Sequence, residues 1–153
     1  MKKYLGAAAL GVLLAGAVGS ETWKTFTSKQ GHFQVQTCGK LVPVKEKEGH
    51  MFCASHPDGE GEEGVVLLHR HLTRYQAFEL LQKISGGAAK QVTERREILV
   101  GGKPGLELIG LNGQGRPIHV RIVDTGVRTY MVMATGMDTA HLRTFVESFR
   151  WLP

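Results

Sequence analysis

The residues best suited to chemistry in this sequence are its two cysteines, Cys38 and Cys53. Apolar and polar residues alternate up to Cys38, as in a half-buried strand, and Cys53 holds the outward position between Phe52 and Ala54. Outward cysteines on neighbouring strands can form a disulfide, and closing a loop of this length stabilises a fold by about 3 kcal/mol in the chain-entropy model. We therefore expect a disulfide between them, with free thiols or metal ligation as the alternatives.

Two histidines, His69 and His71, follow an apolar run at residues 65–68. If this segment is a strand, side chains two residues apart point from the same face. With a third ligand such as His119, the pair would suit zinc or copper. The competing interpretation is a polar sheet face whose imidazoles bind nothing specific. We treat His69 and His71 as a candidate metal site.

The triplet Asp124-Thr125-Gly126 follows two apolar residues, as does the catalytic turn of aspartic proteases, where paired carboxylates share a proton. Too little chain follows Gly126 for the long β-rich segment that such an enzyme needs. Asp and Gly are also the ordinary residues of tight turns. The triplet therefore predicts a turn between two strands, and we assign no catalytic residue anywhere in the chain.

The N-terminus has the pattern of a secretory signal peptide. Lys2 and Lys3 precede an apolar run at residues 4–18, and the small residues Gly19 and Ser20 follow it. We expect residues 1–20 to be removed, leaving residues 21–153 as a single domain; retention as an anchor is the alternative. The product would be secreted or periplasmic, where conditions favour disulfides, and would have no membrane span.

Composition narrows the function classes. The chain has 19 basic residues, 14 acidic residues and 7 histidines, and charges of both signs are interspersed. A nucleic-acid-binding protein needs a basic face or stripe, which this pattern does not provide. We also find no nucleotide-binding or metalloprotease motif. We therefore expect no cofactor and no nucleic-acid partner, and we leave catalysis uncertain but disfavoured.

Strand patterns dominate the rest of the sequence. They occur at residues 21–28, 32–38, 51–55, 65–71, 92–100, 106–111, 117–123 and 127–134. The first two should form a hairpin and the last four a meander. Thr73 and Gln76 form a capping box for one amphipathic helix, and Asp138 caps a second. The expected fold class is α+β, an antiparallel sheet with two helices packed on it.

Several segments resemble the PsbP-like group of exported domains. They are Trp23 before the first hairpin, GHFQV at 31–35, GGKPGLEL at 101–108, RTYMVMATG at 128–136 and FVESFRWL at 145–152. The resemblance implies an α/β/α sandwich around a central antiparallel sheet. It also implies a role in binding other proteins rather than in catalysis, and it transfers no catalytic residues.

We therefore expect a secreted or periplasmic, non-enzymatic accessory domain that binds a protein partner in the cell envelope. The competing hypothesis is a periplasmic metal-binding protein, or a metal-dependent enzyme, that uses the strand face bearing His69 and His71.

Overall fold

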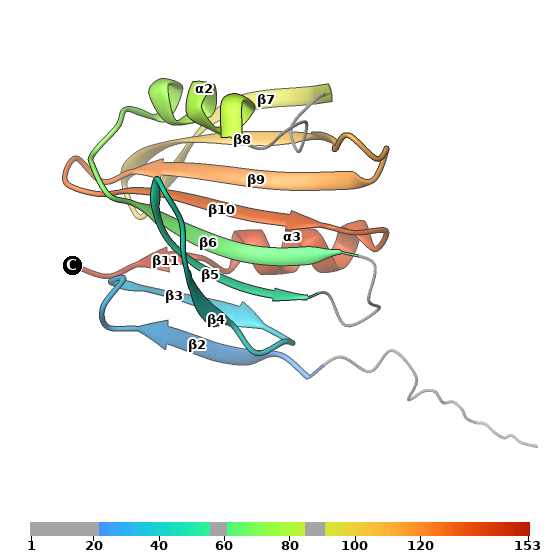
Figure 1. The fold of residues 1–153 in the computed structure, drawn as a ribbon, viewed down its shortest axis with the longest axis horizontal. Coiled ribbons are helices and arrows are strands. Elements are labelled where there is room, and N and C mark those ends of the chain that lie inside the picture. The colour runs from blue at the N-terminus through green and yellow to red at the C-terminus, as the bar shows by residue number, and fades with distance from the viewer. Residues whose placement is uncertain (1–21, 56–60, 85–90) are drawn as a thin grey trace, which may run out of the picture.

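A computed structural model describes residues 22–55, 61–84 and 91–153 of the chain (Figure 1). The expected signal peptide at residues 1–20 lies outside the described residues. Within the described residues, no helix combines the length and the apolar character needed to cross a membrane.

Seven antiparallel strands form the large sheet, in the order β4-β5-β6-β10-β9-β8-β7. Their bounds are Val42–Lys45 for β4, Gly49–Ser55 for β5, Glu62–Leu68 for β6, Gln91–Val100 for β7, Lys103–Leu111 for β8, Pro117–Asp124 for β9 and Thr129–Thr135 for β10. The neighbours β7, β8, β9 and β10 pair in sequence order. The predicted four-strand meander is therefore confirmed.

A second sheet contains three strands in the order β11-β3-β2. Its members are β2 (Lys24–Ser28), β3 (Phe33–Thr37) and the short β11 (Arg150–Trp151). The pairing of β2 with β3 confirms the predicted N-terminal hairpin. Phe33 and Val35 are fully buried on one face of β3, so the hairpin adds its apolar side to the core.

Helix α2 (Arg74–Ile84) begins at the predicted capping box. The Thr73 N–H donates to Gln76 Oε1 at 3.0 Å, and the Gln76 N–H donates to Thr73 Oγ1 at 3.2 Å. These bonds satisfy backbone donors that the first helical turn leaves open. Ala77 and Leu81 are buried against the large sheet, in a cluster with side chains of β6, β8, β9 and β10.

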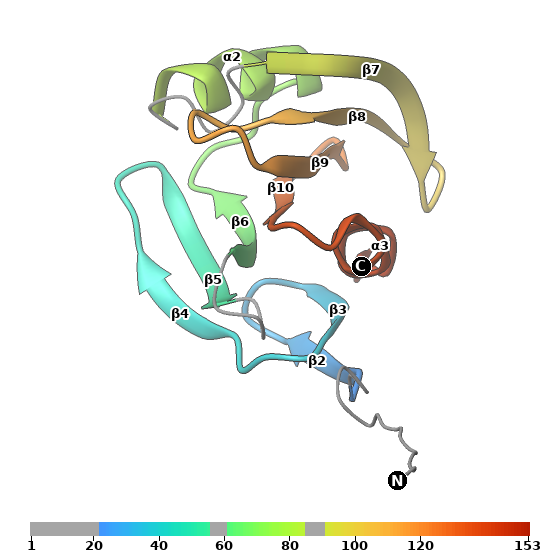
Figure 2. The same cartoon turned by 90° about the vertical axis from the view of Figure 1, so that its right-hand side faces the viewer.

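Helix α3 (Thr139–Glu147) lies on the opposite face of the large sheet. The carboxylate of Asp138 accepts the His141 N–H at 3.2 Å, which confirms the predicted cap. Leu142, Phe145 and Val146 are buried in a second apolar cluster, shared with the small sheet. Figure 2 shows α2 and α3 on opposite sides of β9 and β10, with β2 and β3 beside α3. The α/β/α arrangement that the resemblance implied is therefore confirmed.

Side-chain alternation along β10 separates the two apolar clusters. Tyr130, Val132 and Ala134 face α3 and the small sheet, whereas Met131 and Met133 face α2. All of these side chains except Met133 are at most 2% exposed. Because both faces of β10 are covered, this central strand fixes the positions of the elements packed around it, including the turns at one end of the sheet.

Candidate interaction surface

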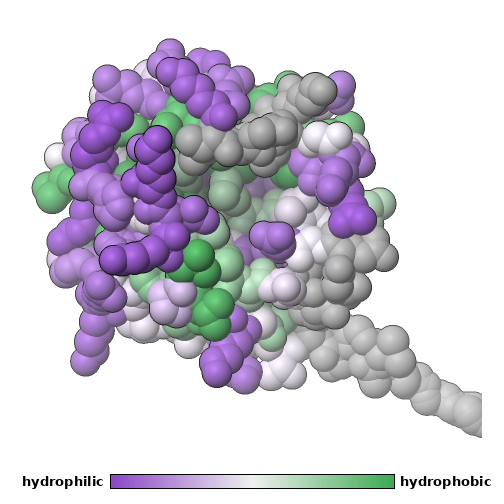
Figure 3. Space-filling model, viewed as in Figure 1, coloured by the Kyte–Doolittle hydropathy of each residue, from purple (hydrophilic) through white to green (hydrophobic). Residues whose placement is uncertain are grey.

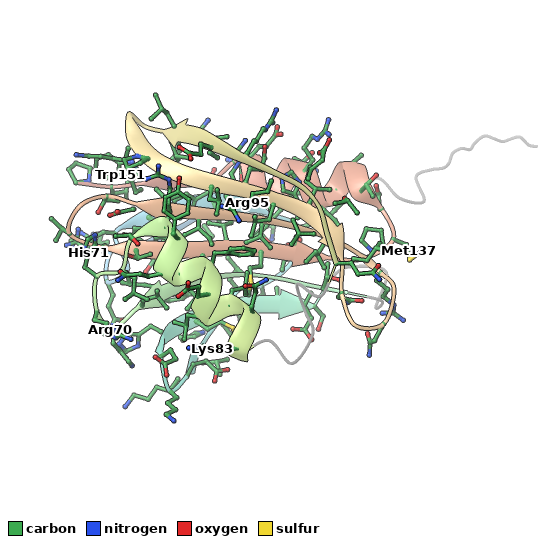
Figure 4. All side chains as sticks on the ribbon, turned by 90° about the horizontal axis from the view of Figure 1, so that it is seen from above. Arg70, His71, Lys83, Arg95, Met137 and Trp151 are labelled. Atoms are coloured by element: carbon green, nitrogen blue, oxygen red, sulfur yellow. The ribbon has the colours of Figure 1, made fainter. Side chains whose placement is uncertain are left out.

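One end of the molecule brings together the turns of four hairpins, the start of α2 and the end of the chain. Two backbone hydrogen bonds and one side-chain hydrogen bond fix this convergence. The Leu152 N–H donates to His32 O at 2.6 Å, the Tyr130 hydroxyl donates to Gly31 O at 2.6 Å, and the His69 N–H donates to Glu48 O at 2.9 Å. We call this the turn end; Arg70, His71 and Trp151 lie there in Figure 4, and Met137 lies at the opposite end.

Large apolar side chains are exposed at the turn end. Leu99 is 75% exposed where β7 approaches its turn, Val127 is 72% exposed in the turn after β9, and Tyr75 is 39% exposed in the first turn of α2. Tyrosine and arginine are enriched at protein interfaces. We define the turn surface by its apolar and basic residues together: His69, Arg70, His71, Tyr75, Leu99, Val127 and Arg128.

The turn at Asp124-Thr125-Gly126 holds Val127 in its exposed position. Asp124 Oδ1 accepts the Gly126 N–H at 2.8 Å, and the backbone of Thr125 donates to Arg128 O at 2.9 Å. Gly126 has φ +89°, a conformation that L side chains rarely adopt. The predicted turn is therefore confirmed, and its fixed geometry presents Val127 to solvent.

Two hollows lie at this end. One, of about 370 Å³, is lined by histidine, arginine and Val127 side chains. The other, of about 300 Å³, lies beside Leu99 and is bordered by Arg74 and Glu97. Together with the exposed Leu99 and Val127, these hollows make the surface at the turn end uneven.

The sequence prediction that His69 and His71 share a strand face is wrong, because β6 ends at Leu68. His71 Nε2 lies 2.6 Å from Asp124 Oδ1, whereas the His69 ring lies edge-on to His50 with 5.1 Å between ring centroids. The suggested third ligand, His119, is buried on β9 and does not line this hollow. In the part of the chain that the structure describes, no three His, Cys, Asp or Glu side chains are grouped to hold a metal ion.

Two carboxylates of the turn end, those of Glu97 and Asp124, are engaged by neighbours. Glu97 accepts hydrogen bonds from the Tyr75 hydroxyl and from Arg74 Nη2, and these bonds lower the pKa of Glu97. Asp124 is held by His71 and by its own turn. Among the described residues, neither Arg70 nor Arg128 has a carboxylate within ion-pair distance. Arg70 and Arg128 therefore present positive charge at the turn surface.

The two cysteines do not lie on neighbouring strands. Cys53 is in β5 of the large sheet, whereas Cys38 follows β3 of the small sheet. Both are half-buried, and within the described residues no disulfide joins them. Burial, and then the charges of Glu62 and Glu46, raise the pKa of the Cys53 thiol, which makes it a weak nucleophile. The neighbouring-strand premise is wrong, and the disulfide itself stays a prediction.

Sequence reasoning missed the turn surface because it treated Leu99 and Val127 as ordinary strand residues; Leu99 does lie in β7 but is exposed there, and Val127 lies in the turn before β10. The available signal was an apolar residue close to a glycine turn, at Gly101-Gly102 and at Gly126. Such positions ordinarily carry polar residues. An apolar side chain there is a sequence indication of an exposed contact.

Comparison with known proteins identifies the fold. No protein-family model matches the sequence, and no curated protein matches it either. The structure is similar to the solution structure of cyanobacterial PsbP (CyanoP) from Synechocystis sp. PCC 6803, with a TM-score of 0.61 and 10% sequence identity. The match covers 92% of this chain and 98% of that chain. The PsbP-like fold expected from the sequence is therefore confirmed; at this identity the likeness shows the fold alone.

Proposed function

We propose that this PsbP-like fold is an exported, non-enzymatic accessory domain that binds an acidic protein partner in the cell envelope through the turn surface. The observation that carries the proposal is the exposure of Leu99 and Val127 at one end of the molecule, where neither Arg70 nor Arg128 has a carboxylate within ion-pair distance among the described residues. Neither apolar side chain contributes to the core in this position. Both are available to a partner.

Apolar contact supplies the affinity in this proposal. Fully burying a Leu or Val side chain contributes about 1.5–3 kcal/mol. Leu99 and Val127 are each more than two-thirds exposed, so most of their surface is available for burial. Tyr75 adds a rigid aromatic ring, over which the Arg74 guanidinium lies 4.5 Å from the centroid. Tyrosine and arginine are among the residues that most often dominate the binding energy of protein interfaces.

Charge selects the partner. Arg70 and Arg128 lie beside the hollow at the turn end, together with His50, His69 and His71. An acidic partner surface is complementary to them, and complementary charge accelerates association more at low salt than at high salt. Binding should therefore weaken as ionic strength rises.

The β7–β8 turn is held by the C-terminal segment, and a preformed turn loses less entropy on binding. Trp151 Nε1 donates to Val100 O at 3.0 Å, which braces the β7–β8 hairpin from the C-terminal segment. An added Cβ at Gly101 would lie 2.7 Å from that same Trp151 nitrogen, so the glycine permits the close approach. The partner meets a surface that is already formed.

Export rests on the N-terminal pattern of residues 1–20. Intact-mass measurement on the protein from its native cell tests it directly. The proposal predicts a chain that begins near Glu21 in the secreted or periplasmic fraction. A chain that retains Met1 in the cytosol would contradict export.

The binding test compares two variants of the full chain. Leu99→Asp combined with Val127→Asp should abolish capture of the partner from native cell envelopes, whereas Met137→Asp should retain it. Met137 is a fair control because it is also exposed, at 58%, and lies at the opposite end of the molecule. Equal capture by the two variants would refute the assignment of the surface, provided that both show the wild-type circular dichroism spectrum.

A metal-dependent function that uses His69 and His71 is the competing proposal. The approach of the His50 ring to His69 supports it, since two imidazoles are part of a zinc site. Zinc titration of the wild-type protein and of His69→Asn distinguishes the two. Stoichiometric binding that His69→Asn removes would favour the metal-dependent function over the accessory role.

A further inference from the structure

A separate cleft lies on the α2 face of the large sheet. It has a volume of about 150 Å³ and is lined mainly by apolar side chains, including Leu81 of α2 and Ile118 and Val120 of β9. Figure 3 shows pale-green, apolar surface in the middle of the face that Figure 1 presents. A cavity of this size suits a small occupant rather than a folded partner.

Three sulfur-bearing side chains line this cleft: Met51, Cys53 and Met133. Met51 and Cys53 are two residues apart on β5, so they point from the same face of the strand. Cys53 pairs with Gly64 from one side, and Met133 pairs with Gly64 from the other. The three side chains therefore flank one short stretch of β6.

Gly64 lies between Cys53 and Met133 in the sheet and places no side chain between them. An added Cβ at Gly64 would lie 2.9 Å from Phe52 O and 3.3 Å from Cys53 Cβ. With no side chain between them, the thiol and the thioether can turn toward each other across β6. Met51 approaches from the adjacent position, and its three rotatable bonds give its sulfur a wide reach.

These methionines differ from an ordinary core methionine. Met131 lies on the same face of β10 and is fully buried. Met51, Cys53 and Met133 are only half-buried and border a cleft that opens to solvent. Their sulfurs are therefore accessible to a small solute.

The surroundings favour a cation. The acidic residue Glu62 also lines the cleft, beside the sulfur-bearing side chains. A negative side chain at the cleft attracts a positive ion more strongly than a neutral solute.

We propose that Met51, Cys53 and Met133 form a binding site for Cu(I). Thiolate and thioether sulfurs are soft ligands that select Cu(I), whereas magnesium and calcium prefer oxygen. On binding, a copper–sulfur bond replaces the S–H bond of Cys53, whose proton passes to solvent. Copper enters and stays in the +1 state, so no electron is transferred. The site does not depend on the turn surface.

This site requires Cys53 as a thiol, so it is incompatible with a bond to Cys38. Alkylation of the denatured protein without reductant, followed by intact-mass measurement, counts the thiols. The copper site predicts that both cysteines are alkylated. Protein in which neither reacts contains the disulfide and would overturn the proposal.

The direct test is an anaerobic competition between the full chain and the chromophoric Cu(I) chelator bicinchoninate. We expect one equivalent of Cu(I) to transfer to the protein, and X-ray absorption at the copper edge to show sulfur neighbours only. Zinc should not compete. Failure of the wild-type protein to take copper from the chelator, or a shell of nitrogen and oxygen, would overturn the proposal.

Variants identify the ligands. Cys53→Ser should weaken Cu(I) binding by more than about 100-fold, because loss of groups that merely orient metal ligands already costs about 10–100-fold. Met51→Leu and Met133→Leu should each weaken it at least about tenfold, and Leu substitutes for Met with little loss of stability. The controls Cys38→Ser and Met137→Leu should bind like the wild type. Unchanged affinity in either cleft methionine variant, or equal losses in Cys38→Ser and Cys53→Ser, would contradict the site.

Discussion

His141 of α3 and Glu63 of β6 form a fully buried contact, with 2.7 Å between Nε2 and Oε2 and both side chains 0% exposed. The other oxygen of Glu63 accepts the Thr37 hydroxyl at 2.8 Å. The Trp23 ring lies 4.7 Å from the imidazole, measured between centroids. Because these residues come from the helix, the large sheet and the N-terminal hairpin region, the cluster fixes the three relative to one another.

Removing the imidazole from this cluster should be costly. We expect His141→Leu to lower the free energy of unfolding by about 2–4 kcal/mol, because it leaves the Glu63 carboxylate buried without this partner. The exposed His69→Leu is the control and should change it by less than about 0.5 kcal/mol. Urea denaturation measures both. Equal stabilities of the two variants would show that the contact contributes nothing.

Glu107 forms the second buried cluster, on the α3 face of β8. Its oxygens accept hydrogen bonds from His119 Nε2 at 2.7 Å, from Arg96 Nη2 at 2.6 Å and from Arg121 Nε at 3.1 Å. Burial alone would raise the pKa of Glu107, but these three donors outweigh it and lower the pKa to about 2. In the folded state this carboxylate therefore stays ionised at pH values well below the usual pKa of a carboxyl group.

Acid should destabilise the protein through Glu107. Its pKa falls on folding from 4.5 to about 2, so its contribution is complete above pH 4.5 and is lost as the pH drops toward 2. We expect the free energy of unfolding to fall by about 3 kcal/mol over this window, because each tenfold change in proton affinity on folding is worth about 1.4 kcal/mol. Urea denaturation from pH 6 to pH 2 measures it. In Glu107→Gln the unfolding free energy should depend less on pH, whereas in the control Glu147→Gln it should depend on pH as in the wild type. An identical pH dependence in the two variants would rule Glu107 out as the source.

Local patterns in the sequence predicted much of the fold. The hairpin of β2 and β3, the meander from β7 to β10 and both helix caps follow from alternation, turn residues and capping chemistry within a few positions. The resemblance to PsbP-like domains added the layer arrangement. These features depend on neighbours in the chain, which a single sequence displays.

Long-range contacts were not predictable in this way. Glu63 and His141 are 78 positions apart, and nothing near either residue indicates the other. The short edge strand β4, rich in valine but containing Pro43, was not predicted as a strand. The end of β6 at Leu68 removed the shared face expected for His69 and His71. Each outcome depends on where distant segments pack.

Two glycines of the β7–β8 hairpin should respond differently to alanine. An added Cβ at Gly110 would lie 1.9 Å from the backbone oxygen of Gln91, so Gly110→Ala forces the paired strands apart. We expect it to cost at least about 3 kcal/mol, within the range of severe core substitutions. Gly102, with φ +81° and open space around it, should lose only about 1 kcal/mol through backbone strain. Thermal unfolding of both variants measures the difference; a larger loss for Gly102→Ala would contradict this packing.

Site-specific photocrosslinking in the native cell tests the turn surface most directly. A benzoylphenylalanine replacing Val127 should give, on illumination, one discrete adduct with an acidic envelope protein. The same probe replacing Met137, at the opposite end of the molecule, should give none. Adducts of equal yield from both positions, or an adduct from Met137 alone, would contradict partner binding through the turn surface.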